Sequence, residues 1–169
     1  MPADESFALP VGQGPAPADV GALIDLVLTR FHAPHRKQGP QLLGAAQRLE
    51  AGHAEDPSWP KGLSALIERI NGRLAAHMAK EEIVVFPRMR RGGGAPLDRP
   101  LAVLHSEHED LERDMGALRE MTNAFTAPNS ASAEWRELYA GLAQFAEDLA
   151  QHTRLEDEVL FPGFEARPK

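Results

Sequence analysis

The sequence predicts an all-α protein, an up-down-up-down four-helix bundle with a kinked first helix. Apolar residues recur at spacings of three and four along four segments, and no stretch alternates with the period of two typical of a half-buried β-strand. Proline and glycine clusters separate the four segments. The 169 residues suit one domain. We expect a flexible Pro/Ala-rich tail at residues 1–17 and the bundle at 18–165.

The first two predicted helices are punctuated by proline. The first covers about 18–49, and Pro34 and Pro40 are expected to kink or interrupt it, because proline removes a backbone donor and clashes with the preceding turn. The second covers about 61–86 and is expected to be ended by Pro87 and the Gly92-Gly93-Gly94 run.

The last two helices are predicted at about 97–124 and from Ser132 to Pro162. Ser132 is a candidate N-cap, because its hydroxyl can accept a bond from a free N–H group of the first turn. Large aromatic residues lie on or beside the apolar stripes or at the helix ends, and we expect them to pack in the core: Trp59, Phe86, Trp135, Tyr139 and Phe161.

Composition excludes several classes of function. The absence of cysteine excludes disulfides, thiolate metal sites and cysteine nucleophiles, so any metal must be held by histidine and carboxylate. A net charge of -7 disfavours nucleic acid and anionic membranes as partners. No run approaches the roughly 20 apolar residues of a membrane span. Asp4 and Glu5 stand where a secretory signal would be positive, so we expect a cytoplasmic protein.

An internal repeat carries the candidate chemistry. Residues 77–87 and 152–162 both read His-x3-Glu-acid-x-Val-aliphatic-Phe-Pro. His32 precedes the first copy by 45 residues, and His108 precedes the second by 44. This near-constant offset predicts a duplicated helical hairpin.

The spacing within the repeat predicts a metal site. Residues four apart lie on one helix face, so each His-x3-Glu pair can point at one place inside the bundle. One such pair alone is more often a solvated ion pair, but two copies in one frame favour a paired metal site with bridging carboxylates. Imidazole and carboxylate ligands suit iron. The candidate metal ligands are His32, His77, Glu81, His108, His152 and Glu156.

The remaining histidines and acids are less specific. His35 is a possible additional ligand, with an orienting or surface role as the alternative. His53 lies in a predicted loop and is expected to cap a helix or lie on the surface, and His105 has no counterpart in the repeat. Three acids are expected on a solvated face: Glu82, Asp157 and Glu158.

The chain resembles the hemerythrin-like superfamily, and more closely its repair-of-iron-centres (RIC) branch of di-iron proteins. The resemblance covers about residues 22–163. The matching segments include Phe31-His32 through His35-Arg36, His77-Met78 with Lys80-Glu81-Glu82, Ser106-Glu107-His108, Leu138 to Leu142, and His152 with Leu155-Glu156 and Leu160-Phe161-Pro162. Several of these residues lie outside the ligand pattern, which makes the match to the branch more specific.

The resemblance implies a cofactor of two iron ions, with four terminal histidines and with Glu81, Glu156 and an oxo or hydroxo group as bridges. It implies a stress protein that binds nitric oxide or oxygen, and that reduces nitric oxide or donates iron to damaged iron–sulfur proteins. Two departures stand out. The chain lacks the N-terminal cysteine-pair domain of full-length members, and it matches four of the five histidines of oxygen-carrying hemerythrins.

The sequence leaves two alternative functions open. One is a reversible oxygen-binding or sensing module without catalysis, and the other is a non-catalytic bundle with an incidental metal site. No catalytic residue stands out beyond the candidate ligands, so the sequence does not decide whether the protein is an enzyme.

Overall fold

The structure is a computed structural model that describes residues 19–92 and 97–165, and all regular structure within these ranges is helical. The predicted tail at 1–17 lies outside the described residues. Four rods form the bundle. The first comprises α1 (Val20–Leu26), the π-helix η1 (Val27–His32) and α2 (Ala33–Gly52); the second comprises α3 (Leu63–Lys80), the π-helix η2 (Glu81–Val85) and α4 (Phe86–Arg90). The third is α5 (Asp98–Met121), and the fourth comprises α6 (Ala133–Leu155), the π-helix η3 (Glu156–Leu160) and the 3₁₀ turn η4 (Phe161–Gly163).

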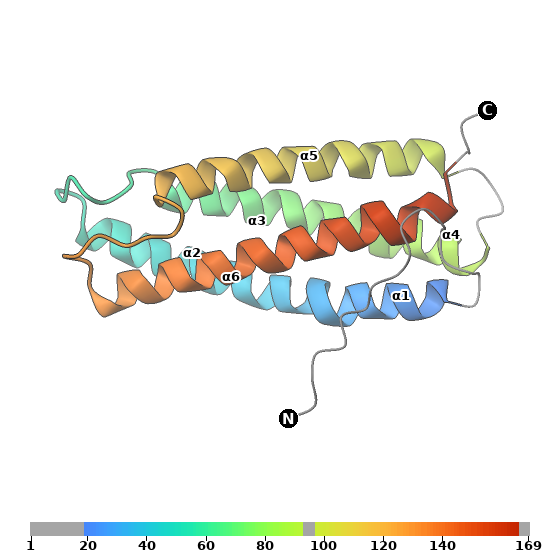
Figure 1. Ribbon diagram of the computed structural model, residues 1–169, viewed down its shortest axis with the longest axis horizontal. Helices are drawn as coiled ribbons and strands as arrows, with labels where there is room; N and C mark the ends of the chain where they lie inside the picture. Colours follow the sequence, from blue (N-terminus) through green and yellow to red (C-terminus); the bar gives the residue numbers. More distant parts are fainter. Residues whose placement is uncertain (1–18, 93–96, 166–169) are drawn as a thin grey trace, which may run out of the picture.

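The four rods lie side by side and alternate in direction (Figure 1), which confirms the predicted all-α bundle. α2 packs closely on α3 and on α6, and α3 packs closely on α5, whereas α5 and α6 touch only loosely. Within the described ranges, no helix combines the length and apolar character needed to cross a membrane.

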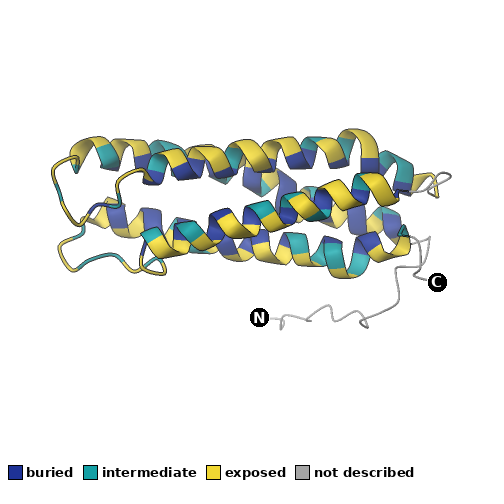
Figure 2. Ribbon diagram, turned by 90° about the horizontal axis from the view of Figure 1, so that it is seen from above, coloured by how far each residue is buried: buried dark blue, intermediate teal, exposed yellow. Residues whose placement is uncertain are grey.

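Buried residues line the inner faces of the rods (Figure 2) and form two apolar clusters. The larger cluster contains Trp59, Trp135 and Tyr139, and the smaller one contains Phe86 and Phe161. These five aromatic residues are therefore core residues, as predicted. Along each rod, the candidate ligands fall between residues of the larger cluster and residues of the smaller one. The site thus occupies a polar layer between two dry cores.

The first helical rod is not interrupted at Pro34, and the second continues past Pro87 to Arg90 instead of ending at Phe86. Both prolines follow a π-helix at the same distance. Ala33, just before Pro34, donates its N–H to the Leu28 carbonyl five residues back. Phe86, just before Pro87, donates to the Glu81 carbonyl, which is also five residues back. Such a wide turn shifts the hydrogen-bond register, so the missing proline N–H costs little at this position.

The third π-helix, η3, ends in the same way at Phe161, and there Pro162 closes the rod as predicted. Pro40 lies inside α2 without ending it. Beside it, Asn71 Nδ2 donates to the Gly39 carbonyl at 2.8 Å and joins α2 to α3. The Ser132 hydroxyl accepts a bond from the Trp135 N–H at 3.2 Å, which confirms the predicted N-cap of α6.

Candidate metal centre

The structure brings all six predicted ligands together in the polar layer. They form two overlapping groups, and in each group the potential ligand atoms lie within 4.8 Å of one another. Glu81 and Glu156 belong to both groups, so they occupy the position expected of bridging ligands. The first group adds His32 and His152, and the second adds His77 and His108.

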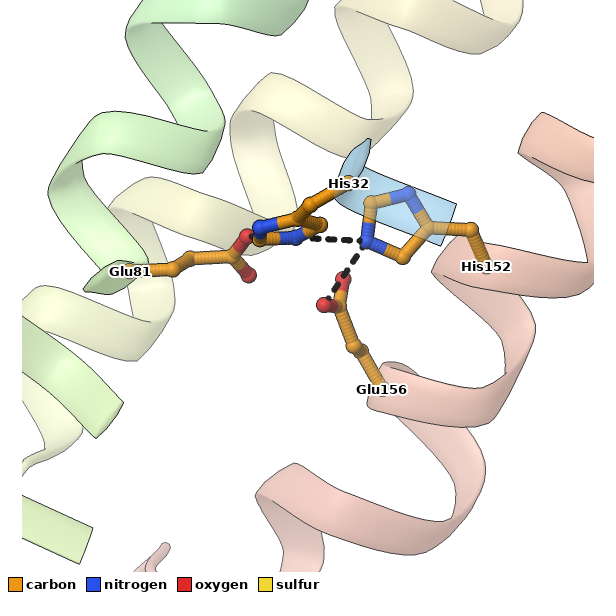
Figure 3. A group of neighbouring side chains, drawn as sticks. All are labelled: His32, Glu81, His152 and Glu156. Atoms are coloured by element: carbon orange, nitrogen blue, oxygen red, sulfur yellow. Dashed lines mark hydrogen bonds and ion pairs between the residues drawn. The ribbon is translucent and has the colours of Figure 1, made fainter. Parts of the chain in front are cut away.

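The first group is built from η1, η2, α6 and η3 (Figure 3). His32 Nε2 lies 3.1 Å from His152 Nε2 and 3.2 Å from Glu81 Oε2. His152 Nε2 lies 2.9 Å from Glu156 Oε1. Each of η1, η2 and η3 begins or ends at one of these residues, and π-helical turns are frequent at functional sites.

The second group repeats this arrangement with α3 and α5. His77 Nε2 lies 3.0 Å from His108 Nε2 and 3.4 Å from Glu81 Oε1. His108 Nε2 lies 3.2 Å from Glu156 Oε2. In both groups, therefore, two imidazole nitrogens and two carboxylates converge on one point.

These six residues fit a pair of metal ions. Five of them are at most 1% exposed, and His108 is 6% exposed. Both carboxylate oxygens of Glu81 and Oε2 of Glu156 have no partner of hydrogen-bonding geometry within the described structure. Burying a carboxylate without partners is unfavourable, and metal coordination would satisfy these oxygens and the facing Nε2 atoms together. Imidazole and carboxylate donors suit iron, so the donor set agrees with the predicted metal.

The electrostatics of the site agree with cation binding. Burial disfavours imidazolium, but Glu156 and Glu81 outweigh it and raise the pKa of His77 to about 10. Burial also disfavours the charged form of His108, but Asp157 and Glu156 outweigh it and raise the pKa of His108 to about 9. The surrounding imidazole groups hold the pKa of Glu156 well below its usual range in spite of burial. Without metal, the carboxylates thus keep the imidazoles protonated, and bound metal ions would displace those protons.

The acid that follows each glutamate of the repeat contacts a histidine of the preceding rod. Glu82 Oε1 lies 2.6 Å from His32 Nδ1, and Asp157 Oδ1 lies 2.8 Å from His108 Nδ1. The predicted solvated face is therefore wrong for these two acids, and only Glu158 is exposed as expected. A carboxylate on the outer nitrogen orients an imidazole ligand and raises its basicity. The sequence signal for this contact is the acid that follows the glutamate in both copies of the repeat.

Glu107 has no place in the His-x3-Glu pattern, yet its Oε2 lies 3.1 Å from His77 Nδ1. The repeat aligns Glu107 with Phe31, which stacks on His152 with ring centroids 5.2 Å apart and planes 8° apart. His152 Nδ1 has no hydrogen-bond partner in the described structure. Three of the four histidines therefore have a carboxylate at Nδ1, and the fourth, His152, does not.

His35 belongs to neither four-residue group. It is 2% exposed, its ring centroid lies 5.4 Å from that of His152, and both of its ring nitrogens have no partner among the described residues. Burial, with the nearby His152, lowers the pKa of His35 to about 3. His35 is therefore a neutral, buried neighbour of the site in this structure.

The two other histidines lie apart from the six. His53 ends α2, and its Nδ1 donates to the Leu49 carbonyl at 2.8 Å, in agreement with the expected capping role. His105 lies outside the centre, against Asp157.

The two groups differ in how close their histidines lie to solvent, and we name them accordingly. His32 and His152 form the sheltered half, in which both side chains are 0% exposed. His77 and His108 form the open half, because His108 lines a cavity between α5 and α6. Glu81 and Glu156 are common to both halves.

Comparisons with known proteins agree with this geometry. A family model described as the hemerythrin HHE cation binding domain matches residues 24–164. The iron-sulfur cluster repair proteins YtfE of Citrobacter koseri and Escherichia coli O157:H7 are each 37% identical over 145 residues, which is 86% of this chain and 66% of those proteins. YtfE of Yersinia pestis (strain Pestoides F) is 37% identical over 140 residues, covering 83% of this chain and 63% of that protein. The chain thus spans slightly less than two thirds of the length of these relatives.

Proposed function

The chain belongs to the hemerythrin HHE cation-binding family, and we propose that it is a di-iron protein that binds nitric oxide and donates iron to damaged iron–sulfur clusters. The proposed setting is the cytoplasm under nitrosative or oxidative stress. The relatives named iron-sulfur cluster repair proteins support this role over most of the chain's length. Their similarity also agrees with the predicted likeness to the repair-of-iron-centres branch.

The observation that carries the proposal is the sharing of two buried carboxylates by two pairs of histidines. Glu81 and Glu156 lie within reach of both pairs, and three of their four oxygens have no hydrogen-bond partner in the described structure. A single ion would use only one pair of histidines. The duplicated arrangement favours two ions, and the absence of thiolate donors favours iron over softer metals.

Each residue has a distinct part in this proposal. The four Nε2 atoms and the two shared carboxylates would hold the iron ions. Glu82, Glu107 and Asp157 orient three of the imidazoles and hold the Nδ1 protons. The two apolar clusters keep bulk water from both ends of the site. When bound, iron supplies redox chemistry and affinity for small diatomic molecules.

Metal analysis tests the cofactor. Protein purified without oxygen should contain about two irons per chain, as the two groups of ligand atoms require. His77→Ala and His152→Ala should each lose iron, whereas Gln151→Ala, an exposed neighbour on α6, should retain it. A well-folded wild-type protein that takes up no transition metal would exclude the proposal.

Iron transfer tests the function. The iron-loaded protein should reactivate a [4Fe–4S] dehydratase that has lost iron by oxidation, and the metal-free protein and His77→Ala should not. Anaerobic addition of nitric oxide to the reduced, loaded protein should produce a new electron paramagnetic resonance signal. Equal reactivation with and without bound iron, or stable reversible oxygen binding without iron transfer, would contradict the role and favour an oxygen-binding module.

A further inference from the structure

The carboxylate of Glu82 is shared between a candidate ligand and a surface arginine. Its Oε1 atom lies 2.6 Å from His32 Nδ1 and accepts a bond from Arg36 Nη1 at 2.7 Å. Arg36 follows His32 by four residues on the first rod, and Glu82 belongs to the second rod. The side chains of His32, Glu82 and Arg36 are 0%, 29% and 46% exposed. These contacts therefore lead from a buried ligand to solvent.

The carboxylate of Glu107 is shared in the same way. Its Oε2 atom lies 3.1 Å from His77 Nδ1, and its Oε1 atom accepts a bond from Lys80 Nζ. Lys80 follows His77 by three residues on the second rod, and Glu107 belongs to the third rod. The side chains of His77 and Glu107 are 0% and 26% exposed, and that of Lys80 is 46% exposed. A second chain of contacts thus leads from a ligand to a surface cation.

Both chains of contacts follow one rule. The carboxylate comes from the next rod in chain order, and the second basic side chain comes from the rod of the histidine. Asp157 follows this rule at His108, with His105 as the second basic side chain, although His105 also contacts Glu165. His152 has no partner at Nδ1 in the described structure. Chance surface ion pairs would not be expected to repeat this connection on three successive rods.

A basic side chain on the shared carboxylate changes what the histidine can do. A carboxylate at Nδ1 raises the basicity of an imidazole ligand. A cation on the same carboxylate attracts part of its negative charge and fixes its direction, so the bond to Nδ1 becomes weaker and better oriented. Partial burial raises the pKa of Glu82, but Arg36 and His32 outweigh it and hold the pKa below its ordinary value. The carboxylate therefore stays ionised while its charge is divided between two partners.

We propose that Arg36 and Lys80 are positioning residues of the centre, each of which limits the electron donation of one ligand histidine through the shared carboxylate. Arg36 acts on the sheltered half and Lys80 acts on the open half. The hydrogen-bond step follows from the contacts alone, whereas the effect on iron rests on the proposed function. Removal of either cation should make the histidine a stronger donor, which stabilises Fe³⁺ relative to Fe²⁺.

The competing interpretation is that both cations only form surface ion pairs that join neighbouring rods. Exposed ion pairs contribute little to stability, so this role would have a small effect on unfolding. It would leave the hydrogen bond at Nδ1 and the reduction potential of bound iron unchanged. These two quantities therefore separate the interpretations.

The hydrogen-bond step is tested by proton nuclear magnetic resonance of the metal-free full chain. The buried Nδ1 proton of His32 should give a signal protected from exchange, identified by its loss or upfield shift in Glu82→Gln. Arg36→Gln should move this signal downfield, and Arg36→Lys should leave it near the wild-type position. Arg48→Gln, which removes an exposed arginine of α2 paired with Glu134, should not move it. Absence of the signal in wild type, or an unchanged signal in Arg36→Gln, would overturn the proposal.

The effect on iron is tested by the reduction potential of the loaded protein. Arg36→Gln should lower the potential, which corresponds to a several-fold rise in the affinity for Fe³⁺ relative to Fe²⁺. In a Glu82→Gln background the same change should have little effect, because the connection to His32 is already broken. An equal fall in both backgrounds would show that Arg36 acts only as a distant charge, and would contradict the proposal.

The assignment of one cation to each half is tested by Mössbauer spectra of the two variants. Arg36→Gln should shift the iron signal of the sheltered half alone, and Lys80→Gln should shift that of the open half alone. Movement of both signals in each variant would contradict the assignment. A protein that binds no iron would refute the proposed function, and the proton signal of His32 would still decide the hydrogen-bond step.

Discussion

The two halves of the centre have matching ligands and different surroundings. The facing Nε2 atoms are 3.1 Å apart in the sheltered half and 3.0 Å apart in the open half. Yet His77 has Glu107 at its outer nitrogen, whereas His152 has Phe31 stacked on its ring and no partner at Nδ1. The two copies of the repeat therefore agree at the positions that would hold metal and differ at the positions around them.

The divergence lies on the two rods that carry His32 and His108. The π-helix η1 ends at His32, whereas the regular helix α5 carries His108. The aligned positions of the two rods carry residues of different character. Glu107 corresponds to Phe31, His105 to Thr29 and Leu111 to His35. The open half thus has a carboxylate and an imidazole where the sheltered half has an aromatic ring and a threonine, whereas the sheltered half has a buried imidazole where the open half has a leucine.

The largest effect is expected from the shared carboxylates. Glu156→Gln keeps the shape of the side chain but removes the charge common to both halves, so both should lose metal. Iron content per chain should fall in the two halves together. Loss of a single ion would show that the halves are independent and that Glu156 serves only one of them.

A smaller effect is expected from Glu107→Gln, which removes the charged partner of His77 Nδ1. Replacing such outer partners weakens metal binding about 10–100-fold. The open half should therefore weaken while the sheltered half, which has no residue of this kind at His152, keeps its affinity. Competition with a chelator of known affinity measures both. Equal weakening of the two halves would contradict their inequivalence.

The metal-free protein should lose stability as pH rises above about 6.5. His77 and His108 have raised pKa values of about 10 and about 9, so the folded state binds more protons than the unfolded state in this range. Their contribution is complete below 6.5 and is lost as pH rises through 9 and 10, by at most about 1.4 kcal/mol per pH unit per group. Urea unfolding at pH 7, 8 and 9 checks this, and His108→Gln should flatten the curve. A free energy of unfolding that does not fall over this range would contradict the assignment.

The smallest effect is expected from His35→Leu in the sheltered half. This change removes two buried ring nitrogens that have no partner in the described structure, so the free energy of unfolding should stay level or rise by about 1 kcal/mol. Iron content should remain at two per chain. Loss of one iron in this variant would instead identify His35 as a ligand.

Sequence reasoning predicted the bundle and the convergence of six side chains, because helical periodicity decides which face of each rod is buried. It did not predict that the rods continue through Pro34 and Pro87, where a preceding π-helix removes the need for the proline N–H. Hydrogen-bond register of this kind is not visible in apolar spacing. The contact between Glu107 and His77 could not be predicted either, because it depends on how α5 packs on α3.

Glu82 and Asp157 are an intermediate case. The repeat placed an acid after each glutamate, but periodicity alone could not show that these acids turn back to His32 and His108. A residue repeated in both halves without a packing role was evidence of a function in the site.

A Mössbauer spectrum of the iron-loaded protein tests the two-half centre most directly. Two iron signals of equal area are expected, and Glu107→Gln should shift the signal of the open half alone. A single signal that moves as a whole in Glu107→Gln, or iron bound at only one position per chain, would contradict a dinuclear centre with inequivalent halves.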